Sequence, residues 1–455
     1  MSRYADGLLA KPMTNAREVA RRVLDRIAKD SAWATPALDG ELAHTNLDDR
    51  DRRLAAELVY GVLRHRSRID RALAAHADLT KTMPKVVTAL RVAAYQILML
   101  DRVPGYAAVD DAVGAARAAG GQKLAGFTNA VLRKLTANGE PRFDELPADA
   151  KRGTQLWHLH ERYSLARWIL DELVAAIQPG TDPKSTLDER VAQMASAFAE
   201  SAPIIARANS RRTTRDALAE MLNGEGVTTT PVPSVPMALR LEGLGDPARS
   251  ASFMAGTWTV QDTGAQHVAL AAIRALDGVK GKLILDACAG VGGKSSHLAE
   301  LTDDASHIHA ADISATKLGL GAETAQRLGL MSIQRIACDL LDPAAPLAHS
   351  YDLIVLDAPC TGLGVLRRHP DAKWRLQQSD VPRLADLQRM LLDAVIPRLA
   401  PGGTLVYSVC TFTRAEGPDQ IQALCRRSGL VLVEEERTWP PDADAFYLAR
   451  LTKPV

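Results

Sequence analysis

The sequence predicts an α/β protein in three parts: an all-α domain, a small α/β module, and a C-terminal domain built on a parallel, doubly wound sheet. Two observations predict this class. Helical periodicity continues to about residue 135, and apolar strands alternate strictly with helices after residue 257. We place the domains at 1–150, 151–256 and 257–455, a division that a chain of 455 residues can support.

The first domain is predicted from five segments in which apolar residues recur every three or four positions. They are REVARRVLDRIAKD, DRRLAAELVYGVLRHRSRIDRALAAHA, PKVVTALRVAAYQILML, AAVDDAVGAARAAG and GFTNAVLRKL. Amphipathic helices joined by short turns indicate an all-α bundle.

Arginines crowd one stretch of these helices. A charge run is most simply a solvated helix face with local ion pairs. The choice of arginine over lysine also fits a phosphate-binding surface, because the guanidinium fork matches phosphate oxygens. On that second interpretation the candidates are Arg50, Arg52, Arg53, Arg64, Arg66 and Arg68.

The middle of the chain is predicted to hold a small α/β module. PIIARAN, TTRDALAEML and MALRLEG indicate strand, helix and strand, with Thr213 and Asp216 spaced as a capping box. Before the module, QPGTDPKSTLDER is polar and contains proline and glycine, which indicates a surface loop.

Five apolar runs define the last domain: KLILDACA, HIHAAD, SIQRIACD, YDLIVLDA and GTLVYSVC. Helices should begin between them and after them, near Gly293, Ser314, Asp380 and Glu416. Strands that are apolar on both faces belong to a parallel sheet, whose ligand crevice lies at the carboxyl ends of the strands. The residues at or just beyond those ends are Asp286, Asp312, Asp339, Asp357, Cys360 and Cys410.

The turn DACAGVGGKSS after the first of these strands fits neither common nucleotide motif. A dinucleotide fingerprint would need a glycine at Ser295, and a phosphate loop would need one at Cys288. What remains is a glycine turn followed by Asp312, in the usual place of a carboxylate that accepts ribose hydroxyls. This combination fits a nucleoside cofactor such as S-adenosylmethionine, with Asp339 at the adenine. Each aspartate taken alone could equally be a turn or cap residue.

Two cysteines at strand ends suggest what such a cofactor would methylate. The sequence Asp-Ala-Pro-Cys at 357–360 lacks the aromatic residue that commonly serves methyl transfer to an amine nitrogen. A thiolate that adds to carbon 6 of a pyrimidine makes carbon 5 nucleophilic enough to attack a sulfonium. The reaction also needs a hydrogen bond to ring nitrogen 3 and a base for the carbon 5 proton. Cys360, Cys410 and Asp357 are the candidates, whereas Cys288, Cys338 and Cys425 are interpreted as small buried hydrophobes.

At this point the motifs resemble a known family. DACAGVGGK, DAPCTGLGVLRRHPDAKW and LVYSVCTF are similar to those of the RNA cytosine-5 methyltransferases, over about residues 257 to 453. DRRLAAELVYGVLRHRSRIDRAL and GFTNAVLRKL resemble the RNA-binding factor NusB. The combination resembles the RsmB family, also called Sun or Fmu, which acts on one cytosine of 16S ribosomal RNA. The resemblance implies a Rossmann-like, S-adenosyl-L-methionine-dependent methyltransferase domain and small-subunit ribosomal RNA as the partner.

The resemblance also implies roles by position. Cys410 would be the nucleophile on carbon 6, Cys360 would help remove the carbon 5 proton, and Asp357 would hold the base edge beside the cofactor. The turn would bind the methionine part, with Asp312 at the ribose and Asp339 at the adenine. The turn comprises Cys288, Ala289, Gly290, Val291, Gly292, Gly293 and Lys294. RNA contacts would come from the six N-terminal arginines together with Lys294, Arg367 and Arg368.

Some positions depart from the family pattern. Gly290 and Val291 replace its usual Ala-Pro, which frees φ and puts cofactor affinity in question. Val409 replaces a common threonine before the nucleophile, and TFTRAEGPDQ keeps only Glu416 of the usual Pro-Glu-Glu-Asn. No proposed reacting group is missing, so an active enzyme is expected. The alternatives are the same chemistry on tRNA and a non-catalytic RNA-binding or ribosome assembly factor.

Composition also bears on whether the chain is a membrane protein, a disulfide-rich protein or a metal-binding protein. No apolar run approaches the ~18 residues of a spanning helix, and MSRYADGLLAKPM lacks a signal-peptide core, so we expect a cytoplasmic protein without a membrane partner. Five cysteines, an odd number, predict reduced thiols, and no Cys/His spacing indicates a metal. The net charge of +1 does not identify a partner. We expect a monomer.

Overall fold

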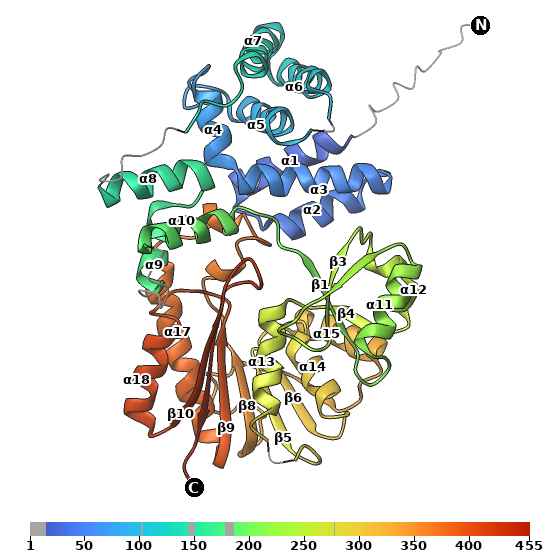
Figure 1. Cartoon of the computed structure of the whole chain (residues 1–455), viewed down its shortest axis with the longest axis vertical. Coiled ribbons are helices and arrows are strands. Elements are labelled where there is room, and N and C mark those ends of the chain that lie inside the picture. Colours follow the sequence, from blue (N-terminus) through green and yellow to red (C-terminus); the bar gives the residue numbers. More distant parts are fainter. Residues whose placement is uncertain (1–14, 102, 144–150, 178–185, 277) are drawn as a thin grey trace, which may run out of the picture. The chain divides into compact units, whose positions relative to one another are not determined.

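The computed structural model describes residues 15–101, 103–143, 151–177, 186–276 and 278–455 (Figure 1). The chain divides into two compact units. The helical unit is Met1–Arg167 with His369–Arg375, and the sheet unit is Trp168–Arg368 with Leu376–Val455. Among the described residues, no helix has the length and apolar character needed to cross a membrane. The segment MSRYADGLLAKPM and residues 178–185 of the predicted surface loop lie outside the described residues.

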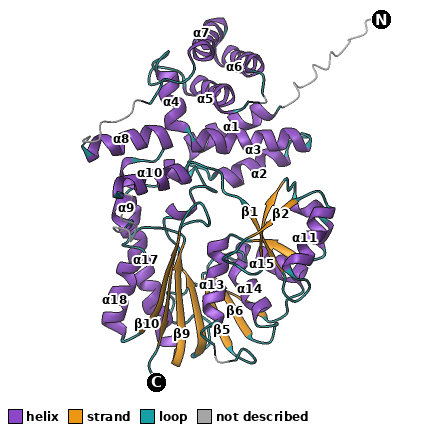
Figure 2. Cartoon of the chain, viewed as in Figure 1, coloured by secondary structure: helices purple, strands orange, loops and turns teal. Residues whose placement is uncertain are grey.

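Within residues 16–138, leaving out residue 102, the described part of the helical unit has seven helices instead of the five predicted (Figure 2). They are α1 (Ala16–Asp30), α2 (Ala34–Ala43), α3 (Asp49–Arg64), α4 (Arg66–Ala74), α5 (Pro84–Met99), α6 (Gly105–Gly120) and α7 (Gln122–Asn138). The prediction missed α2, a short helix with Pro36 in its first turn, where proline is tolerated. It also joined α3 to α4, which separate at His65. Leu58, Leu90 and Leu132 lie in the single core of these helices.

A segment from late in the sequence, His369–Arg375, belongs to the helical unit. Asp371 accepts a 3.0 Å hydrogen bond from the amide of Ala34, the first residue of α2. The Lys373 ammonium donates to the last carbonyl oxygens of α3 and α8 (Arg152–Tyr163), at 3.3 and 3.4 Å. An anion at a helix start and a cation at helix ends both match the helix dipole. The segment is therefore held in the helical unit by helix capping.

The sheet unit begins with α9 (Arg167–Ala176), α10 (Leu187–Phe198) and a four-stranded antiparallel sheet of order β2-β3-β1-β4. Its elements are β1 (Ile204–Ala208), α11 (Arg215–Gly224), β2 (Thr228–Pro231), β3 (Ala238–Glu242), α12 (Ala251–Met254) and β4 (Trp258–Val260). The predicted strand, helix and strand are confirmed as β1, α11 and β3. The predicted capping box is wrong, because the side chain of Thr214 caps α11 by accepting from the Ala217 amide at 3.2 Å.

Among the described residues, the main sheet has seven strands in the order β10-β11-β9-β8-β5-β6-β7. Figure 1 labels β10, β9, β8, β5 and β6. The five predicted strands are confirmed and are parallel: β5 (Leu283–Ala287), β6 (His307–Asp312), β7 (Ile333–Ala337), β8 (Tyr351–Asp357) and β9 (Leu399–Val409). The prediction missed β10 (Val431–Thr438) and β11 (Phe446–Thr452), which are antiparallel. The direction of strand addition reverses between β5 and β8, where a doubly wound sheet has its ligand crevice.

Helices cover both faces of this sheet. On one face α17 (Asp380–Val395) and α18 (Pro418–Ser428) share a core with Leu285, Ile354 and Leu405. On the other, α13 (Thr263–Ile273), α14 (Gly293–Leu301) and α15 (Ala315–Leu328) share a core with Ile284 and Val406. Adjacent residues of one strand thus enter opposite cores, which explains why the central strands are apolar throughout.

Candidate active site

Cys360 and Cys410 meet at the carboxyl ends of two neighbouring strands. Cys360 follows β8 and Cys410 follows β9, and these strands pair in parallel with Asp357 opposite Ser408. The two sulfur atoms lie 3.3 Å apart, within hydrogen-bond distance for thiols. The structure therefore brings together the two cysteines that the strand pattern singled out.

The environment of Cys360 keeps its sulfur protonated. Its pKa lies well above the ordinary value for a thiol, first because of the hydrogen bond with Cys410, then because of burial. The carboxylates of Glu416 and Asp357 act in the same direction. Cys360 thus holds a proton beside the sulfur of Cys410.

Asp357 joins the cysteine pair to the glycine turn. One of its oxygens accepts from the ammonium of Lys294, and the other accepts from the Ser408 hydroxyl at 2.7 Å. Burial is the largest single influence on Lys294 and disfavours its charge, but the attraction and hydrogen bond to Asp357, together with Asp286 and Cys410, outweigh burial and raise the pKa of the lysine. A charged pair therefore lies at the ends of β5 and β8, where the crevice is expected.

The glycine turn takes backbone conformations that favour glycine. Gly290 and Gly292 have φ of 58° and 76°, and Cys288 also has a positive φ of 62°. Asp312 holds the turn from the end of β6, because one carboxylate oxygen accepts from the Gly290 amide at 2.9 Å. Its other oxygen accepts from the Ser314 amide at 2.8 Å.

The residues around this turn have room and unused polar atoms for a ligand. No atom lies within 4 Å of the point where a Cβ on Gly290 would stand. Asp286 is fully buried, burial raises its pKa to about 6, and its Oδ1 has no hydrogen-bond partner among the described residues. Asp339 is exposed beyond β7 and uses one oxygen to accept from the Leu341 amide at 2.9 Å. An open cradle edged by carboxylates fits a nucleoside with hydroxyl and amino groups.

Cys288 belongs to the glycine turn, and no other cysteine is its hydrogen-bond partner among the described residues. Its pKa is raised, first by burial and then by neighbouring carboxylates, including Asp312. An uncharged thiol packed in the turn agrees with the structural role predicted for it.

The predicted RNA-binding arginines of the helical unit fall into distinct environments. Arg50 and Arg53 are exposed on α3, as an RNA contact requires. Arg64 is only 6% exposed, so it is corrected to a buried residue at the end of α3. The half-buried ones have partners within the unit: Arg52 donates to the carbonyl of Leu42, Arg66 lies over Trp374, and Arg68 pairs with Glu140.

The two arginines after Cys360 also serve the fold. Arg367 is 4% exposed and donates to the carbonyl oxygens of Pro441 and Ser201, at 3.1 and 3.3 Å. Arg368 forms ion pairs with Asp262 at 2.6 Å and Asp444 at 2.5 Å. These contacts hold loops of the sheet unit together, and the predicted role of Arg367 and Arg368 in RNA contact stays a prediction.

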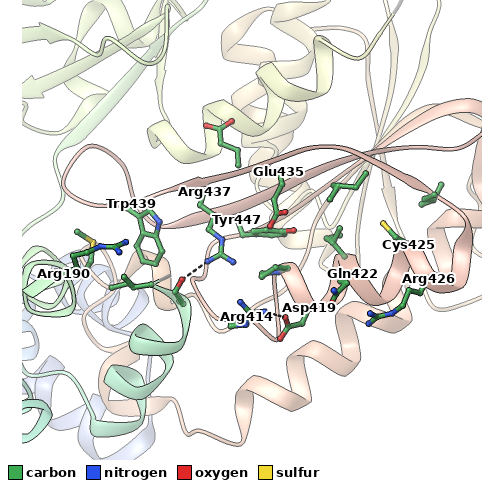
Figure 3. A pocket seen from close by; sticks show the side chains of 18 of the residues that line it. Arg190, Arg414, Asp419, Gln422, Cys425, Arg426, Glu435, Arg437, Trp439 and Tyr447 are labelled. Atoms are coloured by element: carbon green, nitrogen blue, oxygen red, sulfur yellow. Dashed lines mark hydrogen bonds and ion pairs between the residues drawn. The ribbon is translucent and has the colours of Figure 1, made fainter. Parts of the chain in front are cut away.

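A cavity of about 1080 Å³ lies on a different part of the sheet unit (Figure 3). It is lined by side chains from α10, α18, β10, β11 and the loops before α18 and after β10, among them Arg190, Arg414, Arg426, Arg437, Trp439 and Tyr447. Arg414 pairs with Asp419 at 2.9 Å, and Arg437 donates to the carbonyl of Ala176 at 3.1 Å. Neither cysteine of the pair lines it, so its size does not mark the reaction centre.

Comparison with known proteins extends over nearly the whole chain. Residues 273–452 match the family 16S rRNA methyltransferase RsmB/F, residues 14–137 match the NusB family, and residues 184–246 match the RsmF/B-like ferredoxin-like domain. Ribosomal RNA small subunit methyltransferase B of Erwinia tasmaniensis is 34% identical over 457 residues, which cover 97% of this chain and 100% of that protein.

The chain belongs to the RsmB/F family. The protein of the same name from Vibrio cholerae is 34% identical over 422 residues, covering 90% of this chain and 92% of its own. With the ferredoxin-like match, the antiparallel module before the main sheet is an RsmB/F element.

Solved structures share the fold of this chain. The structure of PH0851 aligns with a TM-score of 0.74 at 20% identity, covering 97% of this chain and 100% of that one. NSun6 from Pyrococcus horikoshii, solved with SFG, aligns with a TM-score of 0.53 at 21% identity, covering 58% and 94%. At these identities the likeness concerns the fold.

Within this RsmB/F site, sequence reasoning missed the residues that support the cysteines. It named no role for Ser408, which binds Asp357, or for Thr361 and Glu416, whose side chains are joined at 2.6 Å. One signal was available, because each cysteine of the pair is followed directly by a threonine, Thr361 or Thr411. Hydroxyls at matching places after two adjacent strands can share one acceptor.

Proposed function

We propose that this RsmB/F protein transfers a methyl group from S-adenosylmethionine to carbon 5 of a cytosine in 16S ribosomal RNA, through a temporary bond between Cys410 and carbon 6. The observation that carries the proposal is the position of Cys360 and Cys410, whose sulfur atoms lie 3.3 Å apart at the carboxyl ends of two neighbouring strands. The names of the relatives, ribosomal RNA small subunit methyltransferases, support the choice of RNA.

The glycine turn at 288–294 would hold the methionine part of the cofactor, with Asp312 at the ribose and Asp339 at the adenine. The open space at Gly290 and the spare acceptor positions of these carboxylates support this assignment. When bound, the cofactor supplies a methyl group on a positively charged sulfur.

Cys410 would supply the nucleophile. The Cys410 thiol would first release its proton to the solvent. The thiolate sulfur would then give an electron pair to carbon 6, and the ring electrons would move toward carbon 5, which becomes able to accept a methyl group. Asp357 would accept a hydrogen bond from the cytosine amino group, and the Lys294 ammonium beside it would stabilise negative charge that develops on the ring.

Cys360 would act after methylation. Carbon 5 then carries both a proton and the new methyl group, and the product forms when that proton leaves and the Cys410–carbon 6 bond breaks. The first cause of the raised pKa of Cys360 is its hydrogen bond with Cys410. Once Cys410 is bonded to carbon, that cause is removed, so the Cys360 thiol can release its own proton to the solvent. The thiolate that remains can then accept the proton from carbon 5, while the Cys410–carbon 6 bond breaks and its electron pair returns to the Cys410 sulfur.

The test is to trap the adduct. With unmodified 16S rRNA and S-adenosylmethionine, Cys410→Ala should abolish methylation, and Cys360→Ala should accumulate RNA that stays bound in denaturant. Cys425→Ala, which removes a cysteine outside the pair, is the matched control and should behave as wild type. Full activity of Cys410→Ala would overturn the mechanism.

The same trapped material identifies the substrate. Sequencing the RNA bound to Cys360→Ala should identify the cytosine in 16S rRNA. If tRNA is recovered from a total RNA mixture instead, the proposed substrate is wrong and the proposed chemistry still holds. Failure to bind S-adenosylmethionine in calorimetry, with the fold intact, would favour a non-catalytic assembly factor.

A further inference from the structure

Glu416 lies at the centre of the contacts between the two cysteine-bearing loops, and the proposed reaction gives it no task. Its side chain is fully buried. It sits in the loop between β9 and α18, six residues beyond Cys410 in the sequence. Removing a carboxylate from water costs several kcal/mol unless its oxygens are hydrogen-bonded.

The hydrogen bonds of Glu416 come from both loops. On the Cys360 side, Thr361 donates its amide to Oε1 at 2.8 Å and its hydroxyl to Oε2 at 2.6 Å. On the Cys410 side, the hydroxyls of Thr411 and Thr413 donate to Oε2 at 3.4 and 2.8 Å. One carboxylate thus joins the residues that directly follow the two cysteines.

A glutamine from α17 completes the link. Gln388 is fully buried, and its amide nitrogen donates to Oε1 of Glu416 at 3.1 Å and to the carbonyl of Pro359 at 2.9 Å. The residues on both sides of Cys360 are therefore tied to Glu416, one directly and one through Gln388.

Backbone hydrogen bonds join the same loops, but farther from Cys360. The Ala358 amide donates to the carbonyl of Ser408 at 2.9 Å, and the Gly364 amide donates to the carbonyl of Cys410 at 3.0 Å. Residues 359–363 form the stretch between these two points. Within this stretch, the position of Cys360 depends on Pro359 and Thr361, which are held by hydrogen bonds from Gln388 and to Glu416.

We propose that Glu416 is a positioning residue, which holds the two strand-end loops in register so that the sulfur of Cys360 stays beside the sulfur of Cys410. The catalytic use of this positioning rests on the proposed function. The positions of the two loops relative to each other do not. The negative charge has a second effect, because it adds to the causes that keep Cys360 protonated.

Disulfide formation measures the register without any substrate. Diamide, an azodicarboxamide oxidant, takes one hydrogen atom from each thiol and becomes the hydrazine, while a sulfur–sulfur bond joins Cys360 to Cys410. The full-length wild type should form this disulfide, identified by peptide mapping without reductant. Glu416→Ala should form it roughly tenfold more slowly, since it loses several hydrogen bonds of about 1 kcal/mol each.

Two further variants separate register from general stability. Glu416→Gln keeps the size and one acceptor oxygen, and the threonine hydroxyls can turn to accept from its amide, so most of the wild-type rate should return. Leu328→Ala empties a fully buried site on α15, on the other face of the sheet, and should lower stability without slowing disulfide formation.

The disulfide experiment tests the loop register independently of the methylation reaction. If folded Glu416→Ala forms the disulfide at the wild-type rate, or if Leu328→Ala slows it equally, the proposal is wrong. If Cys410→Ala stays active, the proposed function fails while the disulfide result still stands. In an RNA assay, Glu416→Ala should lower kcat with KM for RNA unchanged and should accumulate the covalent adduct, as Cys360→Ala does.

Discussion

The backbone amide of Gly290 donates a 2.9 Å hydrogen bond to the carboxylate of Asp312, which joins the glycine turn to the end of the neighbouring strand β6. The carboxylate expected to bind a ribose therefore also fixes the turn expected to bind the rest of the cofactor. Changes at either residue should reach both the fold and the ligand.

Gly290→Ala should destabilise the protein by about 1–2 kcal/mol, because an L-residue is strained in the left-handed region. Gly290 has φ of 58°, and no atom would contact the added methyl group, so the cost is one of backbone conformation alone. Urea unfolding measures the stability, and calorimetry should find weaker binding of S-adenosylmethionine.

The matched control is Gly319→Ala. Gly319 lies within α15, also with open space at its Cβ, so the same substitution there should stabilise by roughly 0.5–1 kcal/mol. Equal effects at the two positions would contradict the conformational explanation.

Asp312→Asn tests whether Asp312 acts on the ligand as well as on the turn. Both of its oxygens accept from backbone amides, and an asparagine can offer only one oxygen, so a loss of about 1–3 kcal/mol of stability is expected. If Asp312 also binds a ribose, the variant should lose more affinity for S-adenosylmethionine than for methionine, which has no ribose. An unchanged affinity of the folded variant would restrict Asp312 to its structural role.

Periodicity predicted the central strands well because they are apolar throughout. Ile284 and Leu285 are adjacent in β5 and enter opposite cores, so no polar face weakened the signal. The edge strand β10 was missed since it carries Glu434, Glu435 and Glu436 in a row, a pattern without alternation. Strand β2, Thr228–Pro231, is mostly exposed and lacks apolar residues.

The site was predictable as far as backbone topology determines it. Parallel strands end on one edge, so Cys360 and Cys410 could be expected together before any side chain was placed. The Lys294–Asp357 pair and the contacts of Glu416 depend on side-chain positions across separate loops, which periodicity does not contain. The contacts of Arg367 and Arg368 were not predictable for a related reason, because a basic pair looks the same in sequence whether or not it has partners within the fold.

Asp286→Asn should change how stability depends on pH. Burial raises the pKa of Asp286 to about 6, above the 3.8 of an unperturbed aspartate, so the folded protein binds more protons between these values. Wild-type stability should therefore fall as pH rises from about 4 to 6, by up to about 3 kcal/mol, and stay lower above that window. Asparagine cannot ionise and lacks this loss. Urea unfolding of both proteins at pH 4 and 7 checks it, and a constant difference between them would contradict a raised pKa.

Lys373→Met should produce the opposite dependence in the helical unit. Burial, aided by Arg64, lowers the pKa of Lys373 from 10.5 to about 7, so between these values the unfolded chain binds a proton that the folded unit does not. Wild-type stability relative to the methionine variant should therefore increase as pH rises from 7 toward 10. Unfolding of the full-length chain at pH 7 and 9.5 measures this difference, with the exposed Lys81→Met as the control that should show none.

At pH 7 and below, the methionine loses the hydrogen bonds to the ends of α3 and α8 but avoids a buried charge. If the wild type gains no stability over the variant at the higher pH, Lys373 is charged across the whole range and the helix ends, which favour a cation, outweigh its burial.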